Sequence, residues 1–139
     1  MMASMQAEGQ RLIHESEHIL RHDVQSAWEE QDFNLAVRRA QEVVELCLKG
    51  ALRMLGLDYP RVHDVGPVFS EQARRKLGAV DEKILDRIED ISFWLSQARA
   101  PSFYFEREYS QQDAEHACQD GLFVVSEVTR MLGLRGALA

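Results

Sequence analysis

The chain has 139 residues, of which 45% are hydrophobic and 28% charged, and its formal net charge is −7. This size and composition are those of one globular domain that can bury a core without a disulfide or metal to stabilise it. The acidic balance argues against the broad positive field of a DNA-binding protein, and no apolar run is long enough for a membrane span, so we expect neither partner.

Two long helices are predicted for the first part of the chain. Over residues 4–30, apolar side chains recur at helical spacing among charged ones. Asp32 or Asn34 can cap a second helix that runs to about Leu55, and its apolar stripe is wide enough for a central position. Gly56 is suited to the left-handed turn that commonly follows a helix.

Two further helices are predicted to follow. Asp64 can cap a short third helix that ends near Gly78, and Asp81 opens a fourth. Because proline disfavours helical conformation at the preceding residue, Pro101 should end the fourth helix near Arg99.

The last part of the chain is predicted to contain a loop and one more helix. Residues 101–109 read as a loop rich in aromatic and charged side chains, and Ser110 with Asp113 resembles a capping box that opens the final helix. Short connections favour antiparallel neighbours, so we expect an all-α, up-and-down bundle of about five helices. Residues 1–133 should form this single domain, with 134–139 as a frayed tail.

Several short motifs follow one another in a particular order along the chain. They are Gln41, then Glu45-x-x-Leu48-Lys49-x-x-Leu52, then Gly56, Pro60 and His63, then Arg99-x-Pro101, and last Tyr109-Ser110-x-x-Asp113-Ala114-Glu115. Together they resemble the HEPN domain, named for higher eukaryotes and prokaryotes nucleotide-binding. The resemblance implies a HEPN-like bundle of about five helices, nucleotide binding and, in many members, metal-independent RNA cleavage. It also implies a homodimer and, in bacteria, a minimal nucleotidyltransferase as partner in a toxin–antitoxin or two-component pair.

The RNA-cleaving signature of the resembled family is Arg-x(4–6)-His, and this chain departs from it. From Arg99, the positions available to the histidine hold Tyr104, Phe105 and Glu106. Tyr104 is a poor base because a phenol has an ordinary pKa near ~10, but it can donate a hydrogen bond. Arg99 is either a phosphate ligand or a cation that favours the helix C-terminus. Arg99 and Tyr104 are thus the catalytic candidates, and enzymatic activity is left open.

The loop after Arg99 contributes further candidates. Arg107, Tyr104 and Tyr109 lie in it and can stack on a base and hold a phosphate. For Phe103 and Phe105 we expect packing over the end of the bundle instead.

Three polar residues in the earlier motifs are also candidates. Glu45 and Lys49, one turn apart, form either a solvent-exposed ion pair or the lining of a polar cleft, and we favour the cleft. His63 either titrates in a pocket or bonds backbone groups in the turn, and we favour the turn. The predicted nucleotide-binding set is listed in full as Arg99, Arg107, Tyr109, Lys49, Glu45 and His63.

Neither a metal nor a cofactor is predicted. His14, His18 and His22 form a stripe on the first helix that we expect to be solvated or part of an interface. Cys47 and Cys118 lie on apolar faces without metal-ligand spacing, which is typical of free thiols in a reducing compartment. With no signal-peptide pattern at the N-terminus, we expect a cytoplasmic protein.

Three functional hypotheses follow. The first is a HEPN-like domain that binds a nucleotide or RNA phosphate, acts with a nucleotidyltransferase-type partner, and is catalytically weak or inactive because the histidine is absent. The second is a metal-independent endoribonuclease, a toxin with a substituted active site. The third is a protein-interaction module that uses Phe93 or Trp94, one of which we expect to face a partner.

Overall fold

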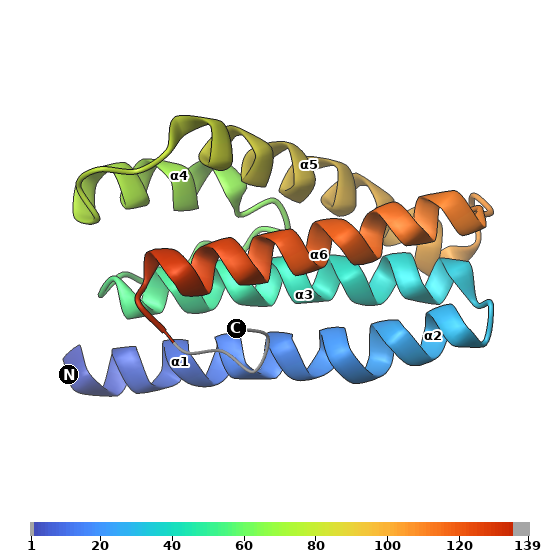
Figure 1. The fold of residues 1–139 in the computed structure, drawn as a ribbon, viewed down its shortest axis with the longest axis horizontal. Coiled ribbons are helices and arrows are strands. Elements are labelled where there is room, and N and C mark those ends of the chain that lie inside the picture. Colours follow the sequence, from blue (N-terminus) through green and yellow to red (C-terminus); the bar gives the residue numbers. More distant parts are fainter. Residues whose placement is uncertain (1, 135–139) are drawn as a thin grey trace.

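The fold is known from a computed structural model that describes residues 2–134, with side chains from Ser4 onward, and consists of five helical rods (Figure 1). The first rod joins α1 (Met2–Ile19), a π-helical segment (Leu20–Val24) and α2 (Gln25–Glu29). The others are α3 (Phe33–Met54), α4 (Gly66–Lys76), α5 (Glu82–Tyr104) and α6 (Gln111–Met131). The predicted all-α bundle of about five helices is confirmed. Residues 135–139 of the expected frayed tail lie outside the described part.

The core is organised around α3. This helix contacts α1 on one side and α5 and α6 on the other (Figure 1). Most of its apolar stripe is fully buried, including Val43, Leu48 and the thiol-bearing Cys47, whereas Leu35 near its start is 36% exposed. Such burial is worth roughly 1.5–3 kcal/mol for each large aliphatic side chain, so α3 is the main source of the bundle's stability. In the described part of the chain, no helix combines the length and apolar character that a membrane span requires.

The first rod and α3 approach each other closely because glycines face each other. A Cβ on Gly9 would lie 2.5 Å from the carbonyl oxygen of Gly50, and one on Gly50 would lie 2.7 Å from that of Gly9. Neither position can hold a larger residue without moving a backbone.

Helix ends follow their predicted caps in most places. The Asp32 carboxylate accepts from Leu35 N at 3.2 Å, and Asp81 accepts from Lys83 N at 2.9 Å. Ser110 and Asp113 satisfy each other's backbone N–H groups reciprocally, so the predicted capping box is confirmed.

Asp64, predicted to cap the third helix, does not do so. Helix α4 begins at Gly66 without a side-chain cap. The Asp64 carboxylate instead accepts from Ser92 Oγ at 2.7 Å, and Ser92 Oγ accepts from Gly66 N at 3.1 Å. Asp64 and Ser92 therefore tie the turn before α4 to the middle of α5.

The predicted end of the fourth helix near Arg99 is also wrong. Helix α5 continues through Pro101 and ends at Tyr104. The first part of the segment 101–109 is therefore helical, and Arg99 lies inside the helix rather than at its C-terminal cap.

Tertiary contacts outweigh the local preference before Pro101. Buried Asn34 on α3 donates through Nδ2 to the carbonyl oxygens of Ser102 (3.2 Å) and Arg107 (2.9 Å). Its Oδ1 accepts from Tyr109 N at 2.8 Å. Three bonds to one side chain stabilise the last turn of α5 and the following loop, so Asn34 anchors the loop and leaves the capping of α3 to Asp32.

The glycine contact gives a stability prediction. Gly9→Ala should lower the free energy of unfolding by about 1–3 kcal/mol, because the new methyl overpacks a backbone carbonyl. Gly121→Ala is the matched control, since its Cβ would meet only side-chain methyl groups, Leu20 Cδ1 at 3.4 Å and Val43 Cγ1 at 3.9 Å. Helix propensity should make that variant as stable as wild type or up to ~1 kcal/mol more stable. Urea denaturation measures the free energy of unfolding of both variants. Equal values would contradict the close approach of α1 and α3 at Gly9 and Gly50.

Candidate functional site

A half-buried carboxylate, that of Glu45, lies at the centre of the predicted polar cluster. Glu45 Oε2 accepts from Lys49 Nζ at 2.8 Å, and Oε1 accepts from Gln41 Nε2 at 2.8 Å. Oε1 also lies 2.9 Å from His63 Nδ1. The favoured expectation that His63 bonds backbone groups in its turn is therefore wrong, because its ring binds a carboxylate on α3.

The cluster determines the protonation of Glu45. Burial alone would raise the pKa of this carboxyl group, but hydrogen bonds from Lys49, Gln41 and His63 outweigh it and lower the pKa below its ordinary value. The Glu45 and Lys49 side chains are only 16% and 14% exposed. Such low exposure agrees better with the expected polar cleft than with the alternative of a solvent-exposed ion pair.

Arg99 approaches the same cluster from α5. Its Nη1 donates to Gln41 Oε1 at 2.8 Å and lies 4.0 Å from Glu45 Oε1. Gln41 thus joins the guanidinium to the carboxylate, because its amide donates to one and accepts from the other. One side of Arg99 is held in place while its side chain keeps 30% exposure.

Arg38, on α3, stands beside Arg99. Burial, followed by the positive charge of Arg99, lowers the pKa of the Arg38 guanidinium. Its Nε is buried, and within the described residues it has no hydrogen-bond partner. The guanidinium lies 4.5 Å from the centroid of the Phe103 ring, which fixes its position by a cation–π contact.

Together these groups form a cationic pocket of about 250 Å³ on the surface between α3 and α5. Its lining is Arg38, His63, Ser96, Arg99, Ala100, Phe103 and Tyr104. A side groove of about 330 Å³ shares Arg99 and is lined also by Leu12, Ile19, Glu42, Glu45, Leu46, Lys49 and Tyr59. Both are concave enough to hold part of a small ligand.

The local charge of this region is opposite to that of the whole chain. Four cations lie near three carboxylates: Arg38, Arg39, Lys49 and Arg99 with Glu42, Glu45 and, beside Arg39, Asp23. Glu42 is paired with Arg39 at 2.6 Å, and Glu45 with Lys49. Arg38 and Arg99 therefore supply positive charge in excess, which favours an anion in the cationic pocket.

The predicted nucleotide-binding residues separate into two places. Arg99, Tyr104 and His63 line the cationic pocket, with Glu45 and Lys49 in the adjoining side groove. Arg107 and Tyr109 lie instead in an α5–α6 groove of about 610 Å³. The expectation that Tyr104 shares one loop with them is wrong, because Tyr104 ends α5.

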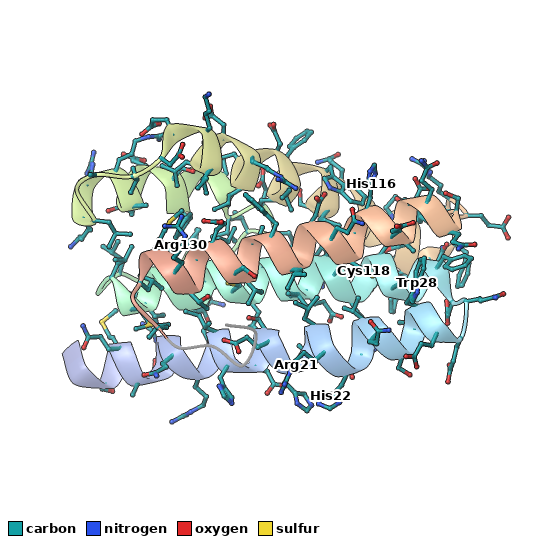
Figure 2. The ribbon with its side chains drawn as sticks, in the orientation of Figure 1. Arg21, His22, Trp28, His116, Cys118 and Arg130 are labelled. Carbon is teal, nitrogen blue, oxygen red and sulfur yellow. The ribbon has the colours of Figure 1, made fainter. Side chains whose placement is uncertain are left out.

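The α5–α6 groove has its own lining. The Arg107 guanidinium lies 4.8 Å from the centroid of the Tyr109 ring and 3.9 Å from an Asp113 carboxylate oxygen. Tyr109 is buried, and burial raises the pKa of its phenol. His116 lines the groove from the α6 side and projects from α6 in Figure 2.

The exposed aromatic residues differ from their expected roles. Phe103 and Phe105 were predicted to pack over the bundle end, but they are 53% and 70% exposed. Phe93 is 57% exposed, whereas Trp94 is partly buried and donates through Nε1 to Asp120 Oδ2 at 2.9 Å. If either of the pair Phe93 and Trp94 faces a partner, Phe93 is the free one.

The histidine stripe lies on the outer side of the first rod. His14, His18 and His22 are all exposed, and Figure 2 shows His22 directed away from the bundle. The rings of His18 and His22 are 4.3 Å apart, centroid to centroid. Among residues 4–134, no three His, Cys, Asp or Glu side chains gather closely enough to hold a metal ion. Burial raises the pKa of the Cys47 thiol to about 12, so this cysteine is unreactive.

Two contributors to the site were missing from the sequence-based set. Gln41 appeared only as a motif residue, and Arg38 not at all. The sequence signal for Arg38 is its place one turn before Gln41 and two turns before Glu45, which puts all of them near one face of α3. That spacing becomes informative only once α5 is known to cross this face.

Comparison with known proteins gives one match. The model of the HEPN domain family matches residues 10–131. This range contains every residue that lines the cationic pocket, the side groove and the α5–α6 groove. No curated protein and no solved structure matches the chain.

The lowered pKa of Glu45 predicts a pH dependence of stability. The charge of Glu45 stabilises the fold fully above its ordinary pKa of 4.5, and this contribution is lost as pH falls through the lower pKa of the folded state. Glu45→Gln should therefore cost about 1.5–3 kcal/mol near neutral pH, and the difference from wild type should shrink below pH 4.5. Denaturant unfolding across this range measures it.

Glu71→Gln is the control for this measurement. It removes a carboxylate that pairs with Arg75 at 3.0 Å on the exposed surface of α4. Exposed pairs contribute little, so its effect should be under about 0.5 kcal/mol. Equal losses of stability in the two variants would refute the claim that the charge of Glu45 stabilises the fold more than an exposed carboxylate does.

Proposed function

The chain belongs to the HEPN domain family, and on that basis we propose that it binds the phosphate group of a nucleotide or an RNA strand in the cationic pocket. Family membership implies a nucleotide- or RNA-related function in general terms. The particular site rests on the residues of this chain.

One observation carries the proposal: Arg38 and Arg99 lie side by side, and nearby carboxylates neutralise their positive charges only in part. Arg99 has a neutral amide as its hydrogen-bond partner, and its nearest carboxylate oxygen is 4.0 Å away. Arg38 has a buried Nε without a partner in the described part of the chain. Two guanidinium groups held this way repel each other, and a phosphate between them would accept from both.

The remaining residues support such a ligand. Lys49 and His63 contact the Glu45 carboxylate at 2.8 and 2.9 Å, closer than the 4.0 Å between that carboxylate and Arg99, so Glu45 neutralises Arg99 only in part. If His63 donates its Nδ1 proton to Glu45, its Nε2 is left as an acceptor. The apolar and aromatic part of the side groove, Leu12, Leu46 and Tyr59, can receive a base or sugar beside the phosphate.

We propose weak or absent catalysis. Metal-free RNA cleavage needs a base for the 2′-hydroxyl and an acid for the leaving oxygen. The three positions where the family signature allows histidine hold Tyr104, Phe105 and Glu106, and a phenol is a poor base at neutral pH. Tyr104 lines the cationic pocket and can at most donate a hydrogen bond there.

A specific observation favours the endoribonuclease as second candidate. His63 lines the cationic pocket together with Arg99, so an imidazole from the turn before α4 is present although the motif histidine is not. In that case His63 would act as base and Arg99 would stabilise the charge on the phosphorus.

The proposed partners come from family membership alone. We propose a nucleotidyltransferase-type partner, in a two-component or toxin–antitoxin system, and a homodimer. Exposed Phe93 is the side chain best suited to a protein contact on the α5–α6 side. Co-expression with the adjacent reading frame and sedimentation of the purified protein test these two points.

Ligand binding tests the cationic pocket. Arg99→Gln and Arg38→Gln should each weaken binding of AMP and of a short RNA about 10- to 100-fold, because each removes a charge-assisted hydrogen bond to phosphate. Isothermal titration at low salt measures the affinities. Arg75→Gln, which removes the same charge from exposed α4, should bind like wild type.

If Arg75→Gln loses as much affinity as the two pocket variants, the effect is one of net charge, and the proposal of a phosphate site in the cationic pocket is contradicted. Unchanged binding by both pocket variants would contradict it as well.

Incubation with RNA in a chelator tests catalysis. The wild-type protein should leave the RNA intact at micromolar concentration. Cleavage that disappears in both Arg99→Ala and His63→Ala would show instead that the endoribonuclease is correct.

A further inference from the structure

Three consecutive aromatic side chains at the C-terminal end of α5 are largely exposed, although the Arg38 guanidinium contacts one of them, Phe103. Phe103, Tyr104 and Phe105 are 53%, 69% and 70% exposed. We call them the aromatic end of α5. Single exposed apolar residues are ordinary, but a contiguous group of three large rings marks a binding surface.

Phe105 is also held in an unfavourable backbone conformation. Its φ of 55° and ψ of 34° place it in the left-handed region, where a helix usually ends on glycine. A bulky residue pays a conformational penalty there, and the 70% exposure of the ring shows that packing inside the chain does not offset it. Contacts within the described chain therefore do not explain why a phenylalanine stands at this position.

The aromatic end adjoins the cationic pocket directly. Phe103 and Tyr104 belong to the pocket lining, and the Arg38 guanidinium rests on the Phe103 ring. Aromatic rings beside a cationic pocket are the arrangement by which proteins bind unpaired nucleic-acid strands: phosphates meet the cations and bases stack on the rings. A protein partner with an apolar surface would not need the uncompensated arginines.

The aromatic end of α5 can stack with more than one nucleic-acid base. The centroids of Phe103 and Tyr104 are 4.8 Å apart, and the two ring planes are nearly perpendicular at 88°. Because the ring planes are nearly perpendicular, one base cannot stack on both rings, and the Arg38 guanidinium already covers one face of Phe103. Such a platform is larger than a mononucleotide requires.

We propose that the aromatic end of α5 is a stacking platform for unpaired bases of a single RNA strand, whose phosphate lies between Arg38 and Arg99. This inference rests on the proposed function and names its ligand as a strand rather than a mononucleotide. The platform adjoins the cationic pocket through Phe103 and Tyr104, which belong to the pocket lining.

Two variants each remove one ring of the platform and keep Arg38, Arg99 and the Phe103 ring against Arg38. Tyr104→Ala deletes one exposed ring. Phe105→Gly deletes another and places in the left-handed position the residue that prefers it, so this variant should unfold at the wild-type temperature or slightly above. Weaker binding in a variant of undiminished stability cannot be attributed to misfolding.

The experiment is fluorescence anisotropy in chelator with a labelled single-stranded RNA oligonucleotide and with the same sequence as a duplex. Each platform variant should bind the single strand about 5- to 100-fold more weakly, because stacking on a side chain contributes that much for one base. Duplex binding should be unchanged, since its bases are already stacked. Phe93→Ala, which removes another exposed ring (57%) from the α5–α6 side, should leave both affinities unchanged.

The outcomes separate this inference from the proposed function. If Arg99→Gln weakens single-strand binding but both platform variants bind like wild type, the platform is refuted and the phosphate site stands. If Arg99→Gln also binds like wild type, the proposed function fails. If the platform variants change the sedimentation coefficient of the RNA-free protein and leave RNA affinity unchanged, the rings cover a protein surface and the platform is likewise refuted.

Discussion

The carboxylate of Glu45 is the interaction on which the candidate site depends. It receives hydrogen bonds from two residues of its own helix, Gln41 and Lys49, and from His63 in the turn before α4. Through Gln41 it also fixes Arg99 on α5. One negative charge therefore joins three segments and permits several cations to stand close together. Its lowered pKa is the electrostatic consequence of this position.

The cationic pocket is small within an acidic protein. A net charge of −7 repels long polyanions at a distance, while Arg38 and Arg99 present local positive charge between α3 and α5. A ligand has to approach closely and use specific contacts before it gains binding energy. Such a balance suits a short or single-stranded ligand better than a long duplex, whose many phosphates would face the acidic remainder of the surface.

Most of the fold could be predicted from the sequence, because helical periodicity and caps are local. Asp32, Asp81 and the Ser110–Asp113 pair act as their residue types indicate. The errors arose where a distant residue overrides a local preference: Asn34, far away in the sequence, stabilises the turn of α5 that follows Pro101.

The site was less predictable for the same reason. Glu45 and Lys49 could be paired by spacing, but His63 joins them through a turn whose path no local rule gives. Arg107 and Tyr109 were grouped with Arg99 because they are near in sequence, whereas continuation of α5 places them on another groove. Arg38 has no motif of its own and becomes part of the site only through packing against Phe103 and the approach of Arg99.

The central claim is that Arg38 and Arg99 together hold a phosphate. A nuclear magnetic resonance titration that follows the side-chain Nε–H signals of the arginines, with AMP as ligand, tests it most directly. The account predicts that the Arg38 and Arg99 signals shift together and saturate at one common Kd, while the signal of Arg75 on α4 stays in place. Signals of Arg38 and Arg99 that do not move at saturating AMP, with shifts confined to other residues, would contradict it.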